Sequence, residues 1–118
     1  MSEVSLRPAV VADIPFIMAS ERLPHAAPFV SHWDEGRHRA GIEGPDMAYL
    51  IGARDAGEPE GFAILGDLKE HNGNVCLYRI VSVRPGSGFG IPFFSTVIDW
   101  AFRETPAHRL WLDVVTDN

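Results

Sequence analysis

The feature that most constrains the fold of this chain is a glycine-rich segment, residues 83–91. It lies between a run of apolar residues and a segment whose apolar residues recur at the spacing of a helix. Glycines recur there at every second position, at Gly86, Gly88 and Gly90. Such a spacing lets the backbone approach a bulky anion closely and leaves its N–H groups uncovered. A helix that begins just after the glycines would aim the positive end of its dipole at the same place. The segment therefore predicts a phosphate-binding loop, with a flexible connector as the alternative.

The sequence around this loop predicts alternating strands and helices. The predicted strands are residues 4–7, 47–53, 60–68, 74–83 and 109–115. The predicted helices run from the cap Asp13 to about residue 21, from 33 to about 42 behind the cap Ser31, and from the glycine loop to Thr105. Residues 23–30 predict a loop, because they contain Pro24 and Pro28.

The strand predicted over residues 74–83 carries apolar side chains on both faces. One face would hold Val75, Leu77, Val81 and Val83, and the other would hold Cys76, Tyr78 and Ile80. Two apolar faces are typical of a strand in the middle of a sheet. We therefore expect this strand to lie centrally, with the glycine loop at its end.

The glycine spacing fits neither of two common nucleotide-binding loops. A P-loop NTPase needs Lys followed by Ser or Thr after its last glycine, whereas Ile91 and Pro92 follow here. A dinucleotide-binding fold places its glycines after its first strand, with an acidic residue about twenty positions later. The glycines here follow the fourth predicted strand, so both classes are disfavoured.

Composition narrows the class of protein further. The 118 residues carry a formal net charge of −6 and are 46% hydrophobic, so we expect one folded domain over residues 1–118. The acidic balance argues against a nucleic-acid partner. No segment has the roughly 18 apolar residues of a membrane span, and the start lacks the pattern of a signal peptide. The single cysteine, Cys76, excludes an internal disulfide framework. We expect a cytoplasmic protein.

Several segments, taken in order along almost the whole chain, resemble one known family. They are residues 6–8 (Leu-Arg-Pro), 13–15 (Asp-Ile-Pro), 61–64 (Gly-Phe-Ala-Ile), 79–83 (Arg-Ile-Val-Ser-Val), 85–90 (Pro-Gly-Ser-Gly-Phe-Gly), 99–102 (Asp-Trp-Ala-Phe) and 108–114 (His-Arg-Leu-Trp-Leu-Asp-Val). Together they resemble the GNAT-type N-acetyltransferases, in the ribosomal-protein-acetyltransferase-like branch.

The resemblance implies an α/β (α+β) protein with the GNAT acyl-CoA N-acyltransferase fold: a mixed, mostly antiparallel sheet flanked by helices, here C-terminally truncated. Acetyl-CoA would lie where the fourth strand splays from the fifth. The backbones of Val81 and Val83 would pair with its pantetheine arm, and the amide of Val81 could polarise the thioester carbonyl. Asn118 matches an asparagine that often contacts the cofactor. The pyrophosphate would bind the N–H groups of Gly86, Ser87, Gly88, Phe89, Gly90 and Ile91.

Two positions depart from the family pattern. The family prefers Gln or Arg where this chain has Pro85, and a basic residue often stands where this chain has Ile91. Arg84 could contact a phosphate instead, or could be a solvated surface arginine. The departures predict cofactor binding that is weaker than the family's.

The implied reaction is acetyl transfer to a primary amine, which needs a base for the amine and an acid for the leaving thiolate. The catalytic residues stay unassigned. No carboxylate lies in the strand 74–83, so the candidate bases come from elsewhere, with a water relay as the alternative. These candidates are Glu21, Asp67 and Glu70. The family's tyrosine acid would lie in a helix beyond Asn118. Tyr78 is a weak substitute for it, because a tyrosine beside Ile80 in a strand more often packs in the core.

Other reactive side chains have simpler explanations. We expect Cys76 to be a small buried hydrophobe, since no partner base is evident. The histidines show no pair at helical i, i+4 spacing, so no metal site is predicted. Four of the five histidines are the candidate metal ligands, namely His25, His32, His38 and His71. Trp33, Phe29 and His32 fall where the family gathers the acceptor, and they either line that cleft or pack on the sheet.

Two functions follow from the sequence. The first is an N-acetyltransferase that moves acetyl from acetyl-CoA to a primary amine, and the glycine loop favours it. The second is a catalytically silent, truncated GNAT-fold module for CoA binding or dimerisation, and the lack of an evident base and acid favours it. An apolar edge at the strand 109–115 also predicts a homodimer.

Overall fold

The computed structural model describes residues 4–29, 33–55, 57–68, 73–105 and 109–112. Its main elements are β1 (Val4–Pro8), α1 (Ile14–Glu21), α2 (Glu35–Glu43), β2 (Ala48–Arg54), β3 (Gly61–Gly66), β4 (Asn74–Ser82), α3 (Gly90–Glu104) and β5 (Arg109–Leu112). Short 3-10 helices, η1 (Val11–Asp13) and η2 (Ala27–Phe29), flank α1. Within these residues no helix has the length and apolar character needed to cross a membrane.

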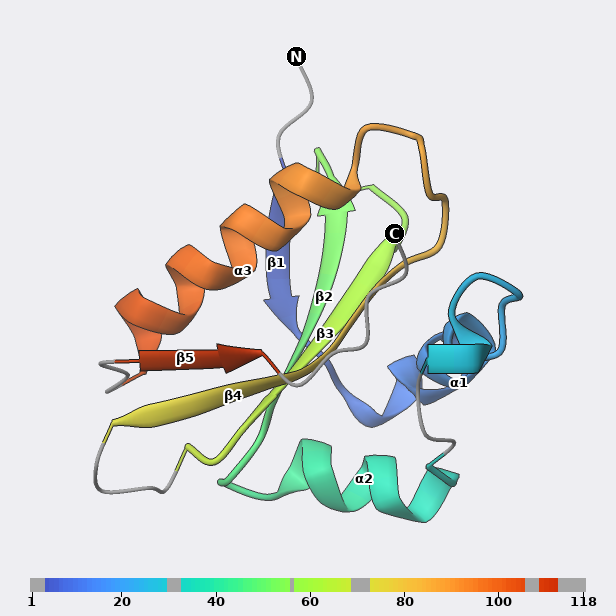
Figure 1. The fold of residues 1–118 in the computed structure, drawn as a ribbon. Coiled ribbons are helices and arrows are strands. Elements are labelled where there is room, and N and C mark those ends of the chain that lie inside the picture. Colours follow the sequence, from blue (N-terminus) through green and yellow to red (C-terminus); the bar gives the residue numbers. More distant parts are fainter. Residues whose placement is uncertain (1–3, 30–32, 56, 69–72, 106–108, 113–118) are drawn as a thin grey trace.

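The described strands form one sheet in which β1 to β5 lie side by side in chain order (Figure 1). The first three pairings, from β1 to β4, are antiparallel, and β4 pairs with β5 in parallel. A parallel neighbour needs a long crossover connection, and α3 supplies it. This arrangement confirms the predicted α+β class with a mixed, mostly antiparallel sheet, and it places β4 between two strands as expected.

Helices cover both faces of the sheet (Figure 1). Along α3, Phe93, Val97 and Ala101 recur every four residues and pack in one cluster with the sheet residue Leu50. Ile17 of α1 belongs to a separate cluster on the other face, where the partly buried residues of α2 also pack. The sheet thus separates an α3 face from an α1–α2 face.

The start of α2 differs from the prediction. The helix begins at Glu35, and Asp34 caps it, since Asp34 Oδ1 accepts a hydrogen bond from the backbone N–H of Arg37 at 2.8 Å. Ser31, the expected cap, lies outside the described residues. Aspartate and serine are about equally good N-caps, so sequence pattern alone could not choose between the two starts.

A bulge in β4 changes which side chains share a face. Successive residues of β3 pair with Arg79 and then with Leu77, so Tyr78 is an extra residue in β4. The two faces of a strand exchange beyond such an extra residue. Leu77 therefore packs on the α3 face, whereas Val81 packs on the α1–α2 face. For this reason it was wrong to expect one common face for Val75, Leu77, Val81 and Val83.

The described part of β5 pairs with only the first half of β4. The pairs run from Asn74 with Arg109 to Leu77 with Leu112, and they stop beside the bulge. Along residues 78–82, the described strands give β4 a partner on the β3 side alone. Residues 113–115 of the predicted last strand lie outside the described residues. Among the described strands, the second half of β4 is thus an edge, and it leads directly into the glycine loop.

Candidate functional site

The glycine loop, defined as residues 83–91, connects β4 to α3 (Figure 1). Gly86 and Gly88 have φ angles of +81° and +85°, a backbone conformation that L side chains rarely adopt. A Cβ atom at either position would meet nothing within 4 Å. Glycine is therefore needed here for the bend of the chain and not for space. The amide of Ser87 donates to the carbonyl of Arg84 at 3.2 Å, which closes a turn.

The end of the loop is also the N-terminus of α3. Gly90 and Ile91 are the first residues of this helix, and N–H groups in a first helical turn have no acceptor within the helix. Ile91 is 84% exposed, and Gly90, directly before it, is also exposed. Exposed donors at the positive end of a helix favour an anion. The geometry therefore suits a phosphate group.

Phe89 anchors the loop on the sheet. Its ring is fully buried and stacks on the ring of Phe93, with centroids 4.9 Å apart. Under the two rings lie Gly52 and Gly61, which pair across β2 and β3. A Cβ on Gly52 would lie 2.4 Å from the Phe93 ring and 3.2 Å from the Phe89 ring. These glycines thus make the space into which the loop inserts its aromatic side chain.

Arg54, the last residue of β2, contacts the loop from the sheet. Its Nη1 donates to the carbonyl of Ser87 at 3.1 Å, and its Nη2 donates to Ser87 Oγ at 3.0 Å. The same guanidinium donates to the carboxylate of Glu60 through Nε at 3.0 Å and Nη2 at 2.8 Å. Hydrogen bonds from Arg54 lower the pKa of the Glu60 carboxyl. The sequence analysis did not predict this pair. The available signal was that Arg54 and Glu60 carry opposite charges at the two ends of the segment that joins the strands predicted over residues 47–53 and 60–68.

The end of β4 presents an edge beside the loop. The amide of Val83 donates to the carbonyl of Glu60 at 2.9 Å, so it points toward β3. The backbone N–H and C=O groups of successive residues point to opposite sides along an antiparallel strand. Those of Val81 therefore point toward β3, like the amide of Val83, and those of Ser82 point to the other side of β4. There the Ser82 carbonyl accepts from Nε2 of His25 at 2.7 Å. A strand added at this edge would meet the backbone of Ser82 and not the amides of Val81 and Val83.

The hydroxyl of Ser82 is a second feature of this residue. Its Oγ is buried and has no hydrogen-bond partner among the described residues. Buried hydroxyls are almost always hydrogen-bonded. Along the chain, the predicted contacts Gly86 to Ile91 follow closely after Val81 and Val83, but the side chains of Val81 and Phe89 are buried. Asn118, the remaining predicted contact, lies outside the described residues.

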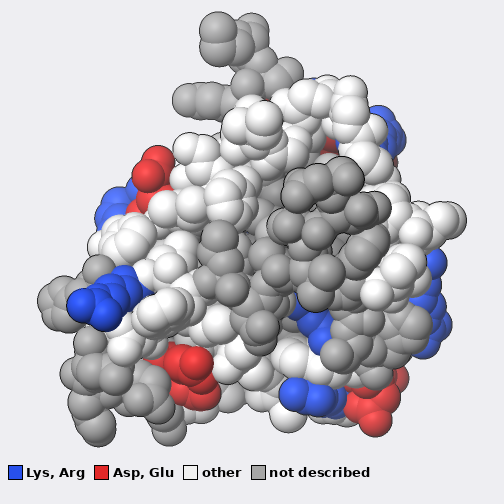
Figure 2. Space-filling model, viewed as in Figure 1, with Lys and Arg blue, Asp and Glu red and all other residues white. Residues whose placement is uncertain are grey.

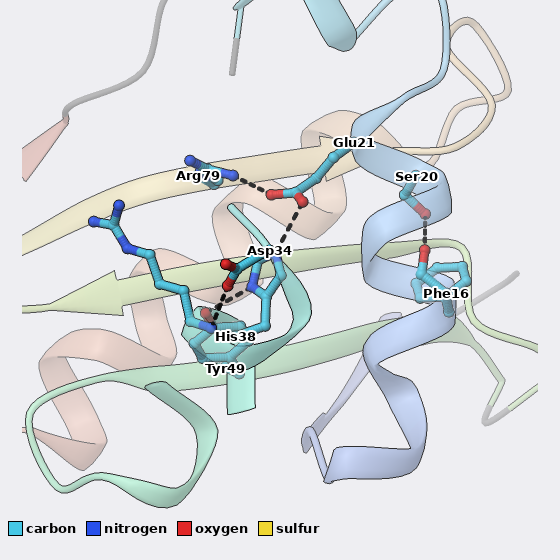
Figure 3. A network of polar contacts seen from close by, with 8 residues as sticks. Phe16, Ser20, Glu21, Asp34, His38, Tyr49 and Arg79 are labelled. Atoms are coloured by element: carbon cyan, nitrogen blue, oxygen red, sulfur yellow. Dashed lines mark hydrogen bonds and ion pairs between the residues drawn. The ribbon is translucent and has the colours of Figure 1, made fainter. Parts of the chain in front are cut away.

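A polar network is buried on the α1–α2 face of the sheet (Figure 3). Glu21, the last residue of α1, binds Arg79 of β4 through Oε2 and accepts from Nε2 of His38 through Oε1 at 2.9 Å. Nδ1 of His38 lies 2.9 Å from the hydroxyl of Tyr49. All four side chains are buried. Because a carboxylate only accepts, Nε2 of His38 carries a hydrogen and donates it to Glu21.

The network fastens α2 to the sheet, since His38 is the buried residue of that helix. Burial, with a smaller contribution from the Glu21 charge, raises the pKa of Tyr49 to about 12. Trp33 lies against the network, with the guanidinium of Arg37 3.8 Å and that of Arg79 4.1 Å from its ring centroid. Of the residues predicted to line an acceptor cleft, the structure thus places Trp33 on this face.

The candidate base and acid side chains already have partners. Both carboxylate oxygens of Glu21 are engaged in the buried network. Asp67 accepts a hydrogen bond from the Tyr78 hydroxyl at 2.8 Å. Burial, followed by this bond, raises the pKa of Tyr78 to about 12. Glu70 lies outside the described residues. Cys76 is half-buried and forms no disulfide.

The histidines are spread over several parts of the molecule. His25 contacts the Ser82 carbonyl and His38 belongs to the buried network, whereas His32, His71 and His108 lie outside the described residues. Where side chains are described, no group of three or more His, Cys, Asp or Glu is placed to hold a metal ion. The backbone of Phe29 lies in η2.

No protein-family model matches this chain, and no curated protein matches its sequence. Solved structures match it through their folds. Spermidine N-acetyltransferase from Vibrio cholerae, in complex with CoA and spermine, superposes with a TM-score of 0.78 at 15% identity. The match covers 93% of this chain and 70% of that chain.

A second match is the tetramutant of the BH1408 protein from Bacillus halodurans, with a TM-score of 0.71 at 18% identity. It covers 96% of this chain and 83% of that chain. Likeness at such low identity shows a shared fold and does not select a branch of the family. The chain has the GNAT acyltransferase fold, as its sequence segments had indicated.

Proposed function

We propose that this protein binds acetyl-CoA at the glycine loop and transfers the acetyl group to a primary amine. The observation that carries the proposal is the loop itself, where Gly86 and Gly88 have positive φ and α3 begins directly afterwards at Gly90. A solved structure of the same fold holds CoA and spermine, a polyamine, which supports both ligand classes. The ribosomal-protein-acetyltransferase-like branch remains a prediction from the matching segments.

The loop fits a diphosphate by its donors more than by its charge. A helix dipole contributes about 0.3–1 kcal/mol to binding an anion at an exposed site, so several aligned N–H groups from Gly86 to Ile91 must supply the rest. On the described part of the face shown in Figure 2, positive and negative side chains lie in several separate small groups. We therefore expect CoA binding to depend on backbone geometry.

The bonds that change are those of acyl transfer. The amine nitrogen attacks the thioester carbonyl carbon, the C–N bond forms, and the C–S bond breaks. The amine loses a proton and the leaving thiolate gains one. In the described part of the chain, an added pantetheine strand would lie along the edge of β4 at Ser82, close to the bulge at Tyr78. The base and acid remain unassigned.

A second function is a CoA-binding module without catalysis. The observation that favours it is that the candidate base Glu21 and the candidate acid Tyr78 both form hydrogen bonds within the protein. A base held in a buried ion pair is poorly placed to take a proton from a substrate. Both functions share the glycine loop and differ in the chemical step.

Calorimetric titration with acetyl-CoA and desulfo-CoA, followed by a thiol-release assay on a panel of amines, separates the two functions. Binding with thiol release supports the acetyltransferase, and binding without release supports the silent module. If the protein shows no binding and no thiol release, both functions are rejected. Gly88→Val tests the loop, because a side chain at this φ strains the backbone. Gly36→Ala in α2, a helical position without positive φ, is the matched control.

We also propose that the protein is a cytoplasmic homodimer. Phe102 of α3 and Trp111 of β5 are large apolar side chains that are 48% and 56% exposed. A second chain that covered them would remove apolar surface from water. Light scattering at increasing protein concentration tests this, and a mass that stays at 13.0 kDa would contradict it.

A further inference from the structure

We propose that Arg54 is a positioning residue that holds the glycine loop in the shape that binds a diphosphate. This inference rests on the proposed function, since it assigns a residue to the same site. Arg54 lies at the end of β2, far from the loop in sequence. Its described hydrogen bonds to the loop both go to Ser87. Ser87 lies between the two glycines whose φ angles are positive.

Three contacts fix the loop to the sheet. At its start, the Val83 amide donates to the Glu60 carbonyl at 2.9 Å. Near its end, the buried ring of Phe89 sits on the floor that Gly52 and Gly61 leave open. Between these points the chain bulges into solvent. The side-chain contact recorded there comes from Arg54, so this residue restrains the part of the loop that carries Gly86 and Gly88.

The guanidinium is itself held in place. Glu60 accepts from Nε and Nη2 of Arg54, and the side chains of Arg54 and Glu60 are only 27% and 16% exposed. Arg54 lies over the ring of Phe89, with 5.5 Å between its Cζ and the ring centroid. A planar guanidinium can bridge a carboxylate and a carbonyl at the same time, whereas an ammonium cannot present this fixed fork. Glu60 thus orients Arg54, and Arg54 orients Ser87.

The direction of these bonds determines what they do for a ligand. The carbonyl and the hydroxyl of Ser87 are both drawn toward Arg54. An oxygen that accepts from Arg54 is kept away from an incoming phosphate, which it would repel. Most donors of the guanidinium are already used by Glu60 and Ser87, so Arg54 acts by shaping the loop and not by binding the phosphate directly.

The experiment compares Arg54→Gln with wild-type protein by two measurements. The first is the ¹⁵N order parameter of Ser87 and Gly88 without ligand, where a rigid backbone gives about 0.85 and a flexible one gives less than about 0.6. The second is the Kd of CoA by calorimetry. If the released loop is competent about one tenth of the time, the Kd rises about tenfold. We expect both changes in Arg54→Gln and smaller changes in Glu60→Gln.

Two further variants separate positioning from simple charge. Arg7→Gln removes another arginine that donates two hydrogen bonds to a carboxylate, that of Asp13, but lies on β1 without contact to the loop. We expect it to leave both measurements unchanged. Arg54→Lys keeps the positive charge but not the fork, so we expect it to resemble Arg54→Gln. Full recovery of CoA affinity in Arg54→Lys would overturn the positioning role.

Order parameters that stay high in Arg54→Gln would also overturn the inference, because the loop would then hold its shape without Arg54. So would an unchanged Kd in a variant with a loosened loop. Failure of the proposed function has a different signature. Wild-type protein that binds no CoA would reject the CoA site, while the order parameters would still show whether Arg54 restrains Ser87.

Discussion

Replacing Glu21 with alanine removes the acceptor that Arg79 and His38 share (Figure 3). Arg79 is 5% exposed, so its charge would remain buried without a counterion. Breaking a buried ion pair by removing one partner costs about 3–5 kcal/mol. A domain of this size has a free energy of unfolding of about 5–15 kcal/mol. We therefore expect Glu21→Ala to lose at least about one fifth of the stability of the protein.

Urea denaturation followed by circular dichroism measures this loss. With an m-value of about 2 kcal/mol/M, the midpoint should fall by about 2 M. The matched control is Glu35→Ala, which removes a carboxylate 3.6 Å from Arg39 in an exposed pair. Exposed pairs contribute about 0–1 kcal/mol, so this midpoint should stay close to that of the wild type.

A double variant tests the electrostatic cause. Glu21→Leu combined with Arg79→Met removes both charges, and a buried pair replaced by apolar side chains is often neutral in stability. We expect the double variant to be more stable than Glu21→Ala, although His38 still lacks an acceptor. Equal midpoints for Glu21→Ala and Glu35→Ala would refute the reasoning, because the buried network would then contribute no more than an exposed pair.

Three other changes test separate parts of the fold. Gly52→Ala should destabilise the protein by about 1–3 kcal/mol, because its Cβ would lie 2.4 Å from the Phe93 ring; thermal unfolding measures this, and an unchanged Tm would contradict it. Burial raises the pKa of Tyr49 from 10.0 to about 12. The protonated hydroxyl should therefore stabilise the fold fully below pH 10, and this stability should be lost as the pH rises toward 12. In a pH series of unfolding measurements, Tyr49→Phe should show a smaller loss over this range. The Arg7 hydrogen bond lowers the pKa of Asp13 from 3.8, so the pair should stabilise the protein above about pH 4 by at most about 1 kcal/mol and lose this as the pH falls. The stability difference between wild-type protein and Arg7→Gln should therefore shrink in acid, and a difference independent of pH would contradict the cause.

Regular elements were predictable from the sequence because their signals are local. The alternation before Pro8 and the apolar run of β2 mark strands wherever they occur in a chain. The glycine loop was predictable for the same reason, since positive φ at Gly86 and Gly88 is a property that glycine alone provides without strain. The collinear segments then indicated the fold class, with its mixed and mostly antiparallel sheet.

Features that depend on contacts between distant residues were not predictable in this way. The bulge at Tyr78 arises from pairing with β3 and has no glycine or proline to mark it. Glu21 and Arg79 are far apart in sequence, and a charged residue at a helix end is usually solvated. Arg54 has the appearance of a turn residue until Ser87 is placed beside it. Each required a partner whose position only the folded sheet defines.

The most direct test of the central claim is a ¹H–¹⁵N correlation spectrum recorded while CoA is added to the full chain. The account predicts that the amides of Gly86, Ser87, Gly88, Gly90 and Ile91 shift most, followed by Ser82 at the edge of β4. Shifts that are confined to other surfaces, or a spectrum that does not change at millimolar CoA, would contradict the assignment of the glycine loop as a diphosphate site.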